Sequence, residues 1–251
     1  MAVTVTGPYT VAAYPDYVFY KFTGAGSVAW TKPDDLETCD ISVVGGGAGS
    51  SGVFSCHGYG AGYCNNQNGI IPSTSTTVVV GNGFKTAGAS GPGEQSAFGS
   101  YTANGGATPS GGGGSGGSGG GSFAGGDGGS NGSAGQVGNG GYAAGTGQGT
   151  TTYTCDGILR CGGGGAGGNT TTNDYGVGGA GGGGTGAMKT GNASTPGIDD
   201  YGGGGGAGSN NSTSNPYGQV GGTGIVVLRY IPVVKKKRGQ PHVNSGGVLI
   251  V

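Results

Sequence analysis

Hydrophobic residues gather in five short runs, four before residue 101 and one after residue 222. The early runs combine aromatic and β-branched residues, which is typical of β-strands. They are 17–22, 27–30, 40–44 and 76–80. The late run, 224–230 (GIVVLRY), is apolar enough to be buried on both faces of a sheet. A single strand is not stable alone, so we expect the late run to pair with the early ones.

Glycine dominates the chain between the early and the late strands, and it makes up 71 of the 251 residues. Because glycine has no side chain to bury, a hydrophobic core cannot organise this part. No stretch has a helical periodicity, and glycine disfavours helices, so we expect essentially no α-helix. The sequence predicts an all-β fold in three parts. These are N-terminal strands (1–101), a glycine-rich block (102–222), and a closing strand with a basic tail (223–251).

The glycine-rich block is either a flexible linker, as Gly/Ser-rich chains usually are, or an ordered lattice. Two features favour order: charged residues make up only 8% of the chain, and tyrosines recur at the edges of the glycine runs. The ordered alternative is polyglycine II, a helix with about three residues per turn and no internal hydrogen bonds. Its N–H and C=O groups must find partners on neighbouring segments. Collagen is excluded, because the glycine runs have no strict three-residue period.

Charge gives no reason to expect nucleic acid as a partner. The formal net charge is −1, and no Lys or Arg occurs from residue 86 to residue 159, so a groove that follows phosphates is not expected there. The N-terminal segment has no signal-peptide pattern, and no apolar run approaches the roughly 20 residues of a membrane helix. We expect a protein that is made in a cytoplasm and does not insert into a membrane.

Three motifs that suggest binding or catalysis lack the residues that such chemistry needs. The stretch 47–52 matches the GxGxxG pattern of dinucleotide sites, but no helix pattern or ribose-binding acid follows it. Cys56, His57 and Cys64 lack the paired spacing of a zinc site. Adjacent acids at 34–35 and 199–200 do not face each other across a substrate, as glycosidase acids do. We therefore expect no enzymatic activity, no cofactor and no metal.

The chain contains five cysteines, at positions 39, 56, 64, 155 and 161. Cys56 and Cys64 flank one short loop, Cys155 and Cys161 flank another, and each pair could close a small disulfide. Spacing alone does not fix connectivity, so free thiols throughout are the alternative. Cys39 is expected to be a buried, unpaired, small hydrophobic residue.

Five segments, taken in order, resemble glycine-rich domain proteins of phage virions. The segments are 19–24 (FYKFTG), 41–49 (ISVVGGGAG), 77–81 (TVVVG), 96–99 (SAFG) and 222–230 (GTGIVVLRY). The layout is also similar to the glycine-rich adhesins at the fibre tips of large myophages. The resemblance implies a small, jelly-roll-like β-sandwich that brackets an inserted polyglycine II bundle, over roughly residues 17–230.

The resemblance also implies a function and a place. The chain would be a structural protein of the virion, made in the host cytoplasm and exposed on the particle surface. As a tail fibre or tip adhesin it would attach the phage to a host receptor, either a glycan or an outer-membrane protein. The alternative is a capsid decoration or head fibre protein with no role in recognition. Other virion proteins would be its partners, and a homo-oligomer such as a trimer is one expected assembly.

Loops that interrupt the glycine runs are the expected recognition surface. Tyrosine suits recognition because it offers a large apolar area and a hydroxyl at low entropic cost. The residues predicted to contact a receptor are Tyr153, Asp174, Tyr175, Asp200, Tyr201 and Tyr217. For each, packing against the edge of the lattice is the alternative. The basic run Lys235, Lys236, Lys237 and Arg238 is expected to contact an acidic virion partner, or else to be a solvated tail.

Overall fold

The computed structural model describes residues 3–5, 9–51, 56–86, 89–168, 174–188, 190, 193–209 and 217–233. Within these residues the fold is all-β, as predicted, and no helix is present. The strands are β1 (Val3–Val5), β2 (Tyr9–Ala13), β3 (Val18–Phe22), β4 (Gly26–Thr31), β5 (Cys39–Val44), β6 (Gly49–Ser51), β7 (Cys64–Ile70), β8 (Ser75–Val80), β9 (Ala89–Gly91), β10 (Ser96–Phe98), β11 (Tyr101–Ala103) and β12 (Ile225–Tyr230).

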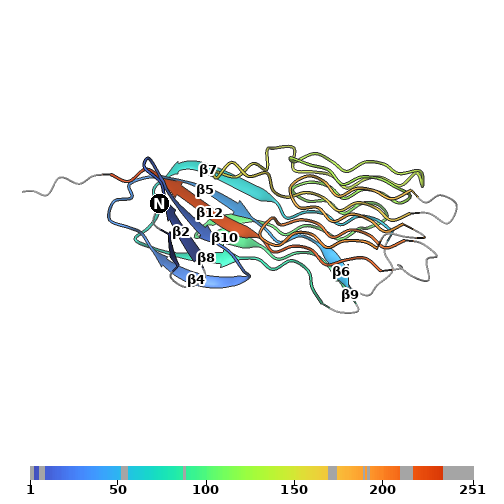
Figure 1. Cartoon of the computed structure of the whole chain (residues 1–251), viewed down its shortest axis with the longest axis horizontal. Coiled ribbons are helices and arrows are strands. Elements are labelled where there is room, and N and C mark those ends of the chain that lie inside the picture. The colour runs from blue at the N-terminus through green and yellow to red at the C-terminus, as the bar shows by residue number, and fades with distance from the viewer. Residues whose placement is uncertain are drawn as a thin grey trace, which may run out of the picture.

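Two antiparallel sheets form a sandwich at one end of the molecule (Figure 1). The larger sheet has six strands in the order β1-β2-β3-β12-β5-β7, and the smaller has four in the order β11-β10-β8-β4. A separate pair, β6 and β9, lies away from the sandwich. The predicted β-sandwich is therefore confirmed.

The last strand, β12, lies between two early strands. Leu228 is opposite Tyr20 of β3 on one side and opposite Ile41 of β5 on the other. The chain therefore has to return to its beginning, across all of the glycine-rich sequence, before the larger sheet is complete. This confirms that the late strand pairs with the early ones.

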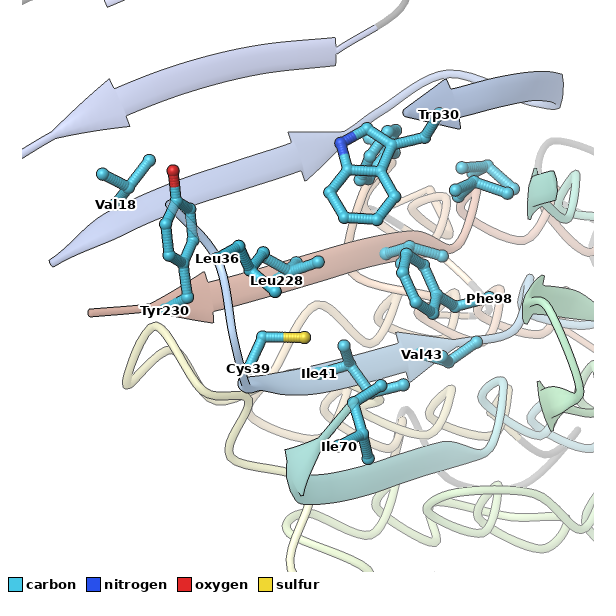
Figure 2. Close-up of a cluster of buried hydrophobic side chains, with 14 of the residues drawn as sticks. Val18, Trp30, Leu36, Cys39, Ile41, Val43, Ile70, Phe98, Leu228 and Tyr230 are labelled. Carbon is cyan, nitrogen blue, oxygen red and sulfur yellow. The ribbon is translucent and has the colours of Figure 1, made fainter. Parts of the chain in front are cut away.

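The main hydrophobic core fills the space between the two sheets (Figure 2). Trp30 and Phe98 come from the smaller sheet, and their ring centroids are 5.5 Å apart. Ile41 and Leu228 face them from the larger sheet. Cys39 lies in the same core as a free, buried thiol, as predicted.

A second buried cluster covers the opposite face of the larger sheet. It contains Ile225 and Val227 of β12, together with Phe19, Val44, Ala61, Cys64 and Cys161. Alternate residues of β12 point to opposite faces, and Val226 and Leu228 belong to the core between the sheets. The prediction that this strand is buried on both faces is therefore confirmed.

We call the extended segments that project from the sandwich the glycine lattice (Figure 1). It consists of 45–48, 56–63, 81–86, 104–149, 161–168, 174–188, 193–209 and 217–224. The lattice thus includes three connections that precede the predicted block 102–222. These connections join the early strands, so the sandwich and the lattice are built from the same stretches of chain.

Backbone hydrogen bonds between segments far apart in sequence hold the lattice together. The N–H of Gly164 donates to Tyr59 O at 2.8 Å, and Gly164 O accepts from the N–H of Gly121 at 2.9 Å. A Cβ atom on Gly164 would overlap the carbonyl group of Gly205. One glycine therefore contacts three other segments, with no room for a side chain. Polyglycine II requires bonding of this kind, and the polyglycine II conformation itself stays a prediction.

Candidate functional site

The lattice is joined to the sandwich through a buried carboxylate, Asp156, whose side chain is 2% exposed. It accepts two hydrogen bonds from the Arg160 guanidinium, at 2.7 and 3.0 Å, and one from Lys21 Nζ of β3 at 2.7 Å. Thr154 Oγ1 donates a further bond at 2.6 Å. Burial alone would raise the pKa of Asp156, but the bonds from Arg160, Lys21 and Thr154 outweigh it and hold the pKa well below its usual range. Asp156 is therefore ionised at neutral pH.

Three of the six predicted receptor residues belong to this junction. Tyr153 O accepts a hydrogen bond from Asn66 Nδ2 of β7 at 3.0 Å. Asp200 Oδ1 accepts one at 3.3 Å from the N–H of Gly24, in the turn between β3 and β4. The Tyr201 ring lies 5.5 Å from the centre of the Arg160 guanidinium. The first two contacts reach the sandwich, and the third holds Tyr201 against Arg160, although the Tyr153 side chain remains 51% exposed.

Two other predicted residues, Asp174 and Tyr175, lie far from the sandwich. The next residue, Gly176, donates its N–H to Ala166 O. Ala166 is five residues beyond Cys161, where the segment leaves the junction. At about 3 Å per residue in an extended glycine segment, the two residues lie roughly 15 Å along the lattice.

A groove of about 440 Å³ opens beside these two residues. Its lining includes Asp174, Tyr175, Val137, Asn139 and Met188. Asn139 Nδ2 donates a hydrogen bond to Asp174 Oδ2 at 3.2 Å, which fixes the carboxylate at the groove wall. The groove therefore combines an acid, an amide, an aromatic ring and a thioether, brought together from two lattice segments, 104–149 and 174–188. We call it the distal groove.

The sixth predicted residue, Tyr217, also lies far along the lattice. It starts the segment that returns to β12, eight residues before Ile225. At about 3 Å per residue, that places it roughly 25 Å from the sheet. Its carbonyl accepts a hydrogen bond from Ser194 Oγ at 2.9 Å, and its side chain is 48% exposed.

A second concavity, of about 520 Å³, lies where the 155–157 loop reaches over the outer face of the larger sheet. Tyr14, Tyr17 and Phe19 form part of its lining, and the centroids of the Tyr14 and Tyr17 rings are 4.8 Å apart. Lys21 and Arg229 supply positive charge at its edge. Sequence reasoning missed this concavity, because the loop that closes it comes from the glycine-rich block. The cluster of aromatic residues at 14–19 was the only signal of it.

The cysteine pairs suggested by spacing are not formed, because all five cysteines are free thiols. Cys64 lies in a buried cluster with Cys161, not with Cys56, and Cys155 Sγ donates to Val227 O at 3.6 Å. Cys155 packs against the same cluster that contains Cys161, whereas Cys56 does not belong to it. The fold thus also brings Cys161 into one cluster with Cys64, from a distant stretch of the chain.

The remaining motifs are parts of the lattice and of turns. The N–H of Gly47, within the GxGxxG match, donates to Gly222 O at 2.8 Å. His57 Nδ1 accepts from the N–H of Phe123 at 3.1 Å. Among the described residues, no group of three His, Cys, Asp or Glu side chains could hold a metal ion. The basic run Lys235–Arg238 lies outside the described residues.

A β-sandwich continued by closely packed, glycine-rich segments defines the chain as an all-β, glycine-rich fold. Residues 23–231 match the glycine-rich domain family, and the chain belongs to that family. A search of curated proteins finds no match. The described part of the chain contains no helix that is long and apolar enough to cross a membrane.

Proposed function

We propose that this protein is a structural protein of a phage virion, a tail fibre or tip adhesin that attaches the particle to its host. One observation carries the proposal: the distal groove and the sandwich lie at different ends of a lattice in which most glycines pack too closely against neighbouring backbone to be replaced by a larger residue. Such a lattice is a spacer that holds a recognition surface away from its attachment point. The order of the segments that resemble phage virion proteins supports the same role.

The chemistry of the distal end suits contact with a host surface. Asp174, Asn139 and the Tyr175 hydroxyl offer hydrogen-bond acceptors and donors beside an aromatic ring, which is how small polar ligands are oriented in grooves. Tyr217 adds a half-exposed aromatic side chain in the same region of the lattice. The receptor would be a glycan or an outer-membrane protein. The sandwich would face other virion proteins, and the protein would be exposed on the particle surface.

The test compares two tyrosines of similar exposure, one far from the sandwich and one at the junction. Tyr217 is 48% exposed and far from the sandwich, whereas Tyr153 is 51% exposed at the junction. Purified wild type, Tyr217→Ala, Asp174→Ala/Tyr175→Ala and Tyr153→Ala would be labelled and titrated onto host cells. We expect the two distal variants to lose adsorption by at least about tenfold, or about 1.4 kcal/mol, while Tyr153→Ala adsorbs normally.

Equal adsorption by all four proteins would contradict recognition at the distal end. The competing role, capsid decoration, makes a different prediction for the whole particle. Phage assembled without this protein would then adsorb normally but lose infectivity faster on heating. If the protein is an adhesin, phage assembled without it should instead adsorb poorly but lose infectivity on heating at the normal rate.

A further inference from the structure

Cys64 and Cys161 meet where the lattice joins the larger sheet. Cys64 begins β7, and Cys161 begins a lattice segment. Their exposed fractions are 9% and 0%, and they share one buried cluster with Val227. The pair therefore joins two parts of the molecule that come from distant stretches of sequence.

The two thiols influence each other inside this cluster. Cys64 Sγ donates to Asn66 Oδ1 at 3.6 Å, and the Cys64 thiol contributes to the raised pKa of Cys161. The neighbouring thiol, Cys155, is directed to a backbone carbonyl of β12 instead. Cys64 and Cys161 are thus neighbours within one buried cluster.

The backbone of each cysteine is held by a different segment. The N–H of Cys64 donates to Gln148 Oε1 at 2.8 Å, and the N–H of Cys161 donates to Tyr201 O at 2.9 Å. Neither residue can move away without breaking these bonds. The placement of both cysteines in this cluster is therefore a fixed feature of the fold.

We propose that Cys64 and Cys161 form a disulfide bond that fastens the lattice to β7 when the protein folds in an oxidising medium. The oxidant is a small disulfide such as oxidised glutathione. One cysteine thiolate attacks it, forming a mixed disulfide and releasing one glutathione thiolate. The second cysteine thiolate then attacks the mixed disulfide and releases the other glutathione. The two cysteines lose two electrons and two protons, and one glutathione disulfide becomes two thiols.

The timing of this reaction follows from burial. Burial, together with the neighbouring Cys64 thiol, raises the pKa of Cys161 well above its ordinary value. The reactive thiolate is therefore scarce once the lattice has closed. Exchange must take place while the lattice assembles, so oxidised glutathione added after folding will leave most Cys161 reduced.

The experiment refolds the full chain from denaturant and reductant into a buffer of reduced and oxidised glutathione. Free thiols are then alkylated, and the protein is digested without reduction. Trypsin cuts after Arg160, which separates Cys155 from Cys161, and chymotrypsin cuts after Tyr63, which separates Cys56 from Cys64. Each of the possible disulfides therefore gives its own linked peptide in mass spectrometry.

We expect the Cys64–Cys161 peptide, with three of the five cysteines alkylated. Cys64→Ser and Cys161→Ser should each abolish it, whereas Cys56→Ser should leave it unchanged. The same digest of protein secreted into the oxidising bacterial periplasm gives a second measurement that does not depend on refolding in vitro. Five alkylated cysteines in both preparations, or peptides linking Cys56 to Cys64 or Cys155 to Cys161, would overturn the proposal.

Discussion

Lys21 of β3 and Asp156, in the loop between lattice segments 104–149 and 161–168, form an ion pair of 2.7 Å. The Lys21 side chain is 31% exposed, but that of Asp156 is only 2% exposed, because Arg160 and Thr154 enclose the carboxylate. A charge from the glycine-rich sequence is thus buried against the outer face of the larger sheet. The pair fixes where the lattice leaves the sandwich.

Replacing Asp156 with Asn should destabilise the protein strongly. The substitution leaves the Arg160 guanidinium, whose side chain is 3% exposed, without its counter-ion. Breaking a buried ion pair by removing one partner usually costs about 3–5 kcal/mol. We expect a decrease of that size in the free energy of unfolding, measured by urea titration.

Lys85→Gln is the matched control for this prediction. Lys85 and Asp199 form an ion pair of similar length, 2.9 Å, but their side chains are 39% and 59% exposed. Exposed pairs contribute about 0–1 kcal/mol, so the control should change the free energy of unfolding by less than about 1 kcal/mol. Equal losses in the two variants would show that Asp156 is not the buried anchor described above.

Acid should weaken the same junction. The pKa of Asp156 is lower in the folded protein than the ordinary aspartate value of 3.8. A carboxyl group with a lowered folded-state pKa stabilises the fold above its unfolded-state pKa, and this contribution is lost as the pH falls through the folded-state value. The free energy of unfolding should therefore decrease from about pH 5 downward. In Asp156→Asn this decrease should be clearly smaller between pH 5 and 2, and an identical pH dependence in both proteins would contradict the assignment.

The five predicted strands could be identified because the pattern of hydrophobic residues in each of them matches its burial in the sandwich. β12 is apolar at almost every position, which matches a central strand buried on both faces. β7 was missed because its sequence, CNNQNGI, is polar. Its asparagines make specific bonds instead of packing in a core: Asn65 Nδ2 donates to Thr102 O, and Asn66 Nδ2 donates to Tyr153 O. These partners are far away in sequence, so no local pattern indicates them.

The candidate site was predictable only in part, for a similar reason. The sequence analysis identified tyrosines and acids at the edges of glycine runs as candidate site residues, and most of them lie within the segments of the lattice. The sequence does not indicate at which end of the lattice each interruption lies. Tyr153 and Asp200 lie at the sandwich, whereas Asp174 lies at the distal groove. The end at which a loop lies depends on how many residues each lattice segment contains between turns, and glycine runs do not mark those turns.

A single methyl group should disrupt the lattice at Gly164. An alanine side chain there would overlap the backbone of Gly205, which cannot move without breaking its own hydrogen bonds. Overpacking with a flexible neighbour usually costs about 1–3 kcal/mol. Against rigid backbone we expect Gly164→Ala to reduce the free energy of unfolding by more than about 3 kcal/mol, measured by thermal or urea unfolding.

Gly141→Ala separates lattice packing from backbone strain. No atom lies within 4 Å of a Cβ atom at this position, but its φ of +71° is unfavourable for alanine. Such a conformation costs about 1–2 kcal/mol. Gly164→Ala should therefore be clearly more destabilising than Gly141→Ala. The reverse order would mean that glycine is needed here for its conformational freedom and not for close approach.

Hydrogen–deuterium exchange should distinguish an ordered lattice from a flexible linker. It should also show that the buried segments of the lattice exchange more slowly than the exposed ones. The N–H groups of Gly120 and Gly121 donate to Gly114 O and Gly164 O, and residues 114–122 are mostly buried. Residues 131–142 are mostly exposed. Pepsin fragments ending near Tyr101, Phe123 and Tyr142 would report on the two layers separately. We expect 102–123 to exchange at least about 100-fold more slowly than the same fragment in denaturant, and 124–142 to be less protected. If both fragments exchange at the rate of the denatured protein, these segments form a flexible linker. In an ordered lattice the amides donate hydrogen bonds and are therefore protected from exchange.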